Sequence, residues 1–260
     1  MIYFITLGLG IIFLILFRIW RNNQLRSVYQ NEISHFSNIG FSDMMTETEI
    51  QIWLQRAKKE GIQRGNWILL EGNGEQLWIA DPDSKQYEIQ PFFKGQKHEI
   101  HCESVNKLNE NEGFAQFKIN DRYSVLAEII PFEENSRNLV YLTAFGVMPT
   151  LYDSENQYEN IVKSKFKKQV VSLAIINHDP NNSKVNPSAE IILSGIIAEH
   201  ERKVNQFTQN VYWHVLIDVG NDVILDTVWD YRLADRFPQR GNVIVGNFYL
   251  FGSYQMERVS

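Results

Sequence analysis

The first twenty residues form the most hydrophobic stretch of the chain. Residues 2–17 contain no charged side chain, and Arg18, Ile19 and Trp20 extend the stretch to residue 20. An α-helix of that length measures about 28 Å, which matches the hydrocarbon core of a bilayer. An arginine near the end of such a helix can reach the lipid headgroups, and tryptophan favours the interface. The pattern predicts a single membrane-spanning helix over residues 2–20.

The charges around this segment predict its orientation and its retention. A cleaved signal peptide would begin with basic residues and end in small residues, whereas this chain begins Met-Ile-Tyr-Phe and continues Arg-Ile-Trp-Arg after Phe17. Arg18, Arg21 and Arg26 all lie on the C-terminal flank. The positive-inside rule therefore predicts an uncleaved anchor in the cell membrane with a cytoplasmic body.

After the polar residues 21–45, the chain carries a clear helix signal. Thr46 and Glu49 form a capping-box pattern, in which a hydroxyl and a carboxylate satisfy free amides at the start of a helix. Apolar residues then recur at helical spacing until Gly61. The sequence predicts one amphipathic helix beginning at Thr46.

From residue 65 onward, the hydrophobic pattern changes to that of short strands separated by turn residues. Gly72-Asn73-Gly74, Asn120-Asp121 and Gly220-Asn221 are typical of tight turns between antiparallel strands. The expected strands are 67–70, 76–80, 87–92, 98–104, 114–119, 122–130, 139–145, 189–198, 211–219 and 222–230, followed by a segment at 241–246 that leads to 248–252. Strands at this spacing favour an antiparallel sandwich or barrel.

The predicted fold class is mainly β: an N-terminal transmembrane helix followed by antiparallel β-sandwich or barrel domains, the last small and OB-like. Both faces of the hairpin over 211–230 are apolar, and Gly195 and Gly246 lie within strands, as in small closed barrels. The predicted parts are an anchor at 1–20, a juxtamembrane helix and linker at 21–45, a β-rich domain with one N-terminal helix at 46–148, a linker with a Lys-rich element and a strand at 149–187, and the OB-like barrel at 188–260.

The C-terminal segment resembles, in architecture alone, the membrane-anchored OB-like domains of NfeD-type proteins. No diagnostic motif accompanies the resemblance, so it implies no function.

Composition narrows the range of functions. The 260-residue chain carries a net charge of −6, which disfavours binding to nucleic-acid backbones. Its single cysteine, Cys102, excludes an internal disulfide and a thiolate zinc cluster within one chain. The glycines of Gly72-Asn73-Gly74 lack the lysine and the following helix of a phosphate-binding loop.

Histidines and carboxylates supply the candidate chemistry. His98, His101 and Cys102 lie close together, but residues 98 and 101 of a strand point to opposite faces, so no metal site is expected there. Asp218, Asp222, Asp226 and Asp230 recur every fourth residue, and we interpret them chiefly as turn and strand-end residues. A cation site or an acid–base pair from Asp226 and Asp230 is the alternative. His200 and His214 are candidates for titration near neutral pH.

The chain has one dense basic cluster, made of Lys163, Lys165, Phe166, Lys167 and Lys168. Such a cluster contacts anionic lipids or a partner in some proteins and is a solvated surface in others. The aromatic residues of the C-terminal segment are expected to be mostly core, and any exposed together would mark a partner-binding surface.

The sequence assigns no catalytic, cofactor-binding or metal-binding residue and implies no cofactor. We expect a non-enzymatic, single-pass membrane-anchored binding or scaffolding protein. Its partners would be the lipid bilayer, through residues 2–20, and a protein partner or a second copy of itself, with no nucleic acid. The alternatives are an enzyme with a site formed by Asp226, Asp230 and His214 in the C-terminal barrel, and a peripheral lipid-docking domain using the Lys163–Lys168 cluster.

Overall fold

The computed structural model describes residues 34–42, 45–84, 87–108, 113–130, 139–176 and 188–254. Residues from His35 onward form one compact unit. Among the described residues, no helix is both long and apolar enough to span a bilayer. The span predicted over residues 2–20 lies outside these ranges, as do its flanking residues Arg18, Trp20, Arg21 and Arg26.

The unit is mainly β, with antiparallel sheets, as the hydrophobic pattern predicted. Its helices are η1 (Ser37–Ile39), α2 (Glu47–Glu60), α3 (Glu155–Val162) and α4 (Leu173–Ile176). The first seven strands are β1 (Ile62–Arg64), β2 (Trp67–Glu71), β3 (Glu75–Ala80), β4 (Glu88–Phe93), β5 (Lys97–Lys107), β6 (Gly113–Ile119) and β7 (Tyr123–Ile129). The others are β8 (Leu139–Tyr152), β9 (Gln169–Ser172), β10 (Glu190–Val204), β11 (Val211–Gly220), β12 (Val223–Asp230) and β13 (Val243–Tyr254).

Short sequence patterns predicted several of these elements correctly. The Thr46 side chain accepts a hydrogen bond from the Glu49 amide, and the Glu49 carboxylate accepts one from the Thr46 amide, so the predicted capping box is confirmed. Helix α2 ends at Gly61. The three predicted turns join β2 to β3, β6 to β7 and β11 to β12. Asn120, Asp121, Asn221 and Asp222 have positive φ angles, as tight hairpin turns require.

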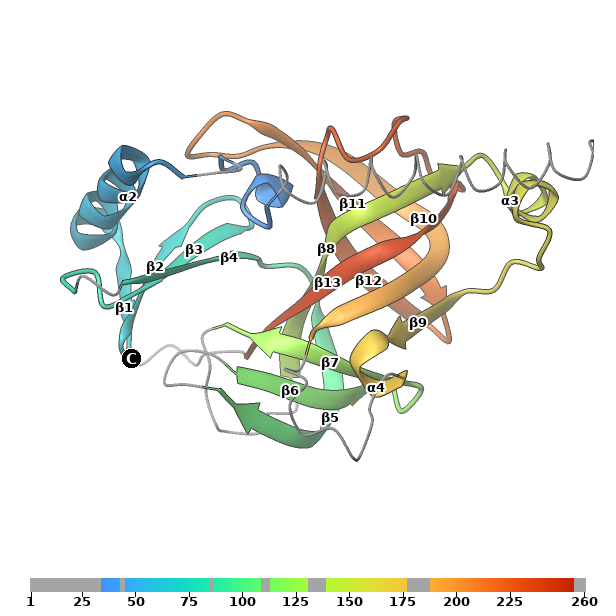
Figure 1. The fold of residues 1–260 in the computed structure, drawn as a ribbon, viewed down its shortest axis with the longest axis horizontal. Coiled ribbons are helices and arrows are strands. Elements are labelled where there is room, and N and C mark those ends of the chain that lie inside the picture. Colours follow the sequence, from blue (N-terminus) through green and yellow to red (C-terminus); the bar gives the residue numbers. More distant parts are fainter. Residues whose placement is uncertain are drawn as a thin grey trace, which may run out of the picture. The chain divides into compact units, whose positions relative to one another are not determined.

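A long antiparallel ribbon of β8 and β13 organises the larger, nine-stranded sheet. The two strands pair from Val140–Tyr254 at one end to Tyr152–Val243 at the other. The second edge of β8 pairs first with β5 and then, in parallel, with β12. The second edge of β13 pairs with β10 and, in parallel, with β7. Figure 1 shows β8 and β13 crossing the unit, with β5–β7 below them.

These pairings close two rings of strands that share the ribbon. One ring runs β8–β12–β11–β10–β13 and returns to β8, and the other runs β8–β5–β6–β7–β13 and returns to β8. The ring that takes in the strands of residues 188–260 therefore also takes in β8, which lies upstream of that range. β8 also runs without a break across residues 148 and 149, where the sequence suggested a domain boundary.

The position of Pro149 explains why the pattern suggested a boundary there. Pro149 lies in β8 opposite Gly246, next to a register shift between Asn247 and Phe248. Proline, which lacks an amide hydrogen, is tolerated in strands at such bulges. A Cβ on Gly246 would lie 2.3 Å from the Met148 carbonyl oxygen, so glycine is required for the two strands to approach here.

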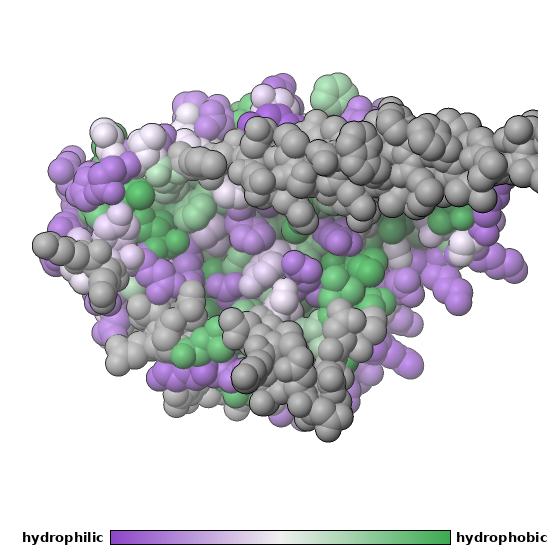
Figure 2. Space-filling model, viewed as in Figure 1, coloured by the Kyte–Doolittle hydropathy of each residue, from purple (hydrophilic) through white to green (hydrophobic). Residues whose placement is uncertain are grey.

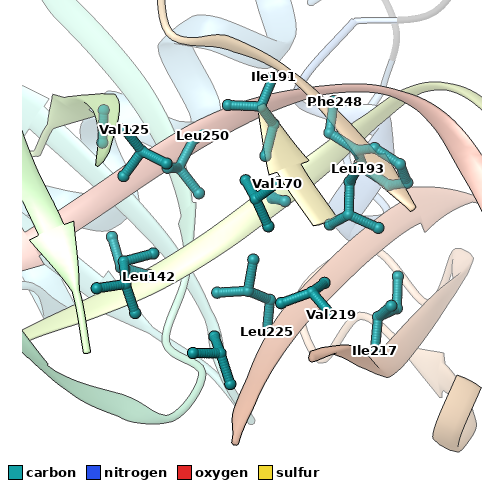
Figure 3. Close-up of a cluster of buried hydrophobic side chains, with 14 of the residues drawn as sticks. Val125, Leu142, Val170, Ile191, Leu193, Ile217, Val219, Leu225, Phe248 and Leu250 are labelled. Carbon is teal, nitrogen blue, oxygen red and sulfur yellow. The ribbon is translucent and has the colours of Figure 1, made fainter. Parts of the chain in front are cut away.

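The inner faces of both rings share one hydrophobic core, which includes Phe117, Ile129, Leu142, Trp229 and Phe248. Figure 3 shows side chains of β7 to β13 converging in this core.

A second core lies on the outer face of the ribbon. The smaller sheet, in the order β1-β2-β3-β4, and helix α2 pack there against Phe145 of β8, Val228 of β12 and Phe251 of β13. The two cores thus form on opposite faces of the same strands.

Candidate functional site

A cavity of about 450 Å³ opens where the β2–β3 turn and the β4–β5 connection meet strands β10, β11 and β12. We call it the His214 cavity. Its lining residues are Glu71, Asn73, Gly74, Phe93, Lys94, Gly95, Gln96, Lys203, His214, Leu216 and Asp226. Five separate segments of the chain therefore supply its walls, and both ionisable and apolar side chains are among them.

His214 and Asp226 form the central polar pair of this cavity. Strands β11 and β12 pair antiparallel with Leu216 opposite Asp226 and His214 opposite Val228, so His214 and Asp226 are diagonal neighbours on one face. The distance from His214 Nε2 to Asp226 Oδ1 is 2.6 Å. Because the carboxylate oxygen accepts, Nε2 donates, and Nδ1 is the second polar atom of the ring.

The main chain of the β4–β5 connection holds the other oxygen of Asp226. The Gln96 amide donates to Asp226 Oδ2 over 2.7 Å. The neighbouring Gly95 lies so close that a Cβ there would be 2.4 Å from Asp226 Cγ. Asp226 is only 1% exposed, and both of its oxygens are hydrogen-bonded, so its carboxylate is fixed in position and fixes the imidazole in turn.

Two lysines face the same cavity in different environments. Lys94 Nζ lies 3.0 Å from Glu71 Oε1. Burial raises the pKa of Glu71, but hydrogen bonds from Lys94 and Gln76 outweigh it and hold that pKa below its usual value. Lys203 Nζ makes longer contacts, 3.4 Å to Glu201 Oε2 and 3.5 Å to the Asn73 carbonyl oxygen. Lys203 is therefore the less strongly paired of the two cations.

The apolar part of the cavity is built around Phe93. Its ring centroid lies 4.7 Å from that of His214, and Lys203 Nζ lies 5.8 Å from its centre. Phe93 is buried, and a Cβ on Gly74 would approach its ring to 2.7 Å. Among the described residues that line the cavity, none is serine, threonine or cysteine.

The remaining aspartates of the predicted array serve other purposes. Asp218 binds Lys168 at 2.8 Å and accepts a hydrogen bond from the Gly220 amide, and Asp222 lies in the following turn. Asp230 accepts hydrogen bonds from the Arg232 guanidinium. Asp230 lies four positions after Asp226, about 13 Å away along β12. The structure thus joins His214 to Asp226 but places Asp230 apart from them.

Asp230 lines a second cavity of about 610 Å³, shared with Arg202, Tyr231 and Arg232. Its carboxylate is already bound by the Arg232 guanidinium, so we regard this cavity as the weaker candidate.

The His98, His101 and Cys102 group does not converge. His101 is exposed, whereas His98 and Cys102 lie on the inward-facing side of β5. His98 Nε2 is buried without a hydrogen-bond partner among the described residues, and burial lowers the pKa of His98, although Asp226 opposes this shift. Burial raises the pKa of the Cys102 thiol, which is the opposite of an activated thiolate. Within the described ranges, no three His, Cys, Asp or Glu side chains are placed to hold a metal ion.

The basic cluster has a more specific structure than its composition suggested. Phe166 stacks edge-on against Tyr158 with centroids 5.5 Å apart, and Lys168 is bound to Asp218. Lys163, Lys165 and Lys167 are exposed. The aromatic ring predicted to contact lipid or a partner is therefore packed against the body, while three of the four lysines face solvent.

The loop between β12 and β13 carries exposed aromatic residues that the sequence analysis missed. Phe237 is 73% exposed and Tyr231 is 55% exposed. By contrast, Tyr212, Trp229, Phe248 and Phe251 are buried, as expected for core residues, and Trp213 is only 7% exposed. The loop has no hydrophobic periodicity, so the only available signal was the presence of Tyr and Phe among arginines.

Comparisons with protein-family profiles, with curated proteins and with solved structures returned no match.

Proposed function

We propose that the chain is a single-pass membrane protein whose β-rich body binds another protein, or a second copy of itself, at the cytoplasmic face of the membrane without catalysing a reaction. The observation that carries this proposal is the exposure of Phe237 and Tyr231 on one loop. Aromatic residues and arginine are enriched at the centres of protein interfaces.

The loop is held in place from several directions, which suits a preformed binding surface. Arg236 forms an ion pair with Asp153 at 2.8 Å, and Arg232 binds Asp230. The Asn242 side chain donates to the Asp153 carbonyl oxygen, and Phe237 lies 5.8 Å from the ring of Trp213 behind it. A surface fixed in this way loses little conformational entropy on binding.

Hydrophobic groups on the surface are not confined to this loop. On the face shown in Figure 2, hydrophilic residues surround small groups of hydrophobic ones, and isolated exposed apolar residues are ordinary in soluble domains. The distinction of the β12–β13 loop is that its exposed residues include two aromatics close to two ion-paired arginines.

Site-specific crosslinking in membranes tests the predicted contact surface. A photoreactive phenylalanine analogue at position 237 of the full-length chain is expected to give a discrete crosslinked product, with twice the chain mass for self-association or another defined mass for a partner. The matched position is Ile52, which is 54% exposed on α2. Equal yields from positions 237 and 52, or no product from 237, would contradict the proposal.

The membrane tether is tested by alkaline extraction. The full-length chain is expected to stay in the membrane pellet, because a 19-residue apolar helix resists high pH, while a chain starting at residue 34 is expected to be released. A reporter fused after Ser260 is expected to be active only if it works in the cytoplasm. Release of the full-length chain, or a native N-terminus beyond Trp20, would refute the tether.

The two alternatives have less structural support. The catalytic alternative required Asp226, Asp230 and His214 to lie together. Asp230 instead lies at the end of β12, where it is bound to Arg232. The lipid-docking alternative relied on Phe166 and four lysines, but Phe166 packs on Tyr158 and Lys168 is paired with Asp218.

A further inference from the structure

We propose that the His214 cavity is a binding site for a small organic acid, a carboxylate attached to a flat apolar body. This inference is independent of the protein-binding surface, because the cavity is formed by other segments of the chain. Its volume of about 450 Å³ lies within the range of small-molecule sites.

The charges around the cavity leave a cation available to the ligand. Glu71 accepts hydrogen bonds from Lys94 and Gln76. Asp226 accepts from His214 and from the Gln96 amide. Both lining carboxylates are therefore already satisfied by groups of the protein.

Lys203 is the cation that remains available. Its contacts of 3.4 and 3.5 Å are longer than the roughly 2.7–2.9 Å of strong charge-assisted hydrogen bonds, and its Glu201 partner is largely exposed. A carboxylate entering the cavity would give the Lys203 ammonium a closer partner and a better-shielded one. His214, fixed by Asp226, presents its ring beside the same space.

The apolar requirement comes from Phe93 and Leu216. Both line the cavity, and the His214 ring lies next to Phe93. Flat rings pack favourably against such a surface. A ligand with only a charged group would leave this part of the wall in contact with water, so we expect an aromatic acid to bind better than formate or acetate.

Two glycines lie where the walls of the cavity leave no room for a side chain. A Cβ on Gly74 would collide with Phe93, and a Cβ on Gly95 would collide with Asp226. The β2–β3 turn and the β4–β5 connection can approach the cavity only because these positions lack side chains. The two segments thereby fix both the apolar and the polar side of the site.

The test is a ¹⁹F NMR titration of 4-fluorobenzoate against the full-length chain in nanodiscs, with empty nanodiscs as the blank. A ligand of this size is expected to bind with a Kd on the order of 1 mM. Lys203→Met keeps most of the side-chain length and removes the charge, and it is expected to weaken binding at least tenfold. The matched control is Lys118→Met, which removes a lysine of β6 that is paired with Glu103 of β5.

Two further measurements separate the charge from the shape of the ligand. The neutral analogue 4-fluorobenzamide is expected to bind at least tenfold more weakly, and Leu216→Trp is expected to abolish binding by filling the cavity while leaving every charge in place. The proposal is overturned by any of three results: no saturable signal above the blank, equal losses for Lys203→Met and Lys118→Met, or equal affinity for the acid and the amide.

Discussion

Replacing Trp229 with alanine is expected to lower the free energy of unfolding by about 3–5 kcal/mol, as is typical when a fully buried tryptophan is truncated. Trp229 has no exposed surface and packs in the core that both rings share, with its ring centroid 6.5 Å from that of Phe248. Its Cβ lies 2.6 Å from the position that a Cβ on Gly146 would take, so the neighbouring backbone is already in close contact.

The measurement is the urea unfolding of residues 34–260, monitored by circular dichroism. Ile224→Ala is the matched control, because Ile224 lies on the same strand and is 38% exposed. The control is expected to lose less than about 1 kcal/mol. Since the two rings share β8 and β13, the Trp229→Ala and Ile224→Ala variants are each expected to unfold in one transition. A Trp229→Ala value close to that of the control would show that the shared core is wrongly placed.

Acid is expected to destabilise the folded body through His35. The imidazole packs against the rings of Phe145, Tyr249 and Phe251, with centroids 4.8–6.1 Å away. Burial lowers the pKa of His35 from 6.5 to about 4. Between those values the unfolded chain binds a proton that the folded chain does not, so the unfolding free energy falls as the pH falls.

The expected size of this effect is about 2 kcal/mol between pH 7 and pH 5, since each pH unit in the window is worth about 1.4 kcal/mol. His35→Phe keeps an aromatic ring in the pocket and removes the titration. Urea unfolding at both pH values is expected to show a smaller loss for His35→Phe than for the natural chain. The loss that remains would come from other groups, including His98, whose pKa burial also lowers. Identical losses would exclude His35 as the source.

Sequence predicted the elements whose causes are local. The Thr46–Glu49 box, the stop at Gly61 and the Gly220-Asn221 turn each depend on a few neighbouring residues, and each is present in the structure. Strand partners depend instead on which edges meet in space. The pairing of β8 with β13 joins residues about a hundred positions apart, and nothing in the pattern around Pro149 indicated it.

The candidate site was also predictable only where it depends on neighbouring residues. Once the hairpin turn is placed at residues 220–221, its register brings His214 diagonal to Asp226, so this pair was within reach of sequence reasoning. Gln96 and Lys94 approach from more than a hundred residues upstream, and Glu71 and Phe93 belong to the other sheet. Their contribution became visible only with the three-dimensional arrangement.

The sharing of β13 by both rings also has a consequence for biogenesis. Neither ring has its full set of strands until residues 243–254 have been synthesised and have left the ribosome. Before that point, the nascent chain carries nearly all of its β-forming sequence with the edges of β8 and β10 still lacking a partner, a state prone to misassociation. We therefore expect production of this chain to depend on chaperones that shield it until its last strand arrives.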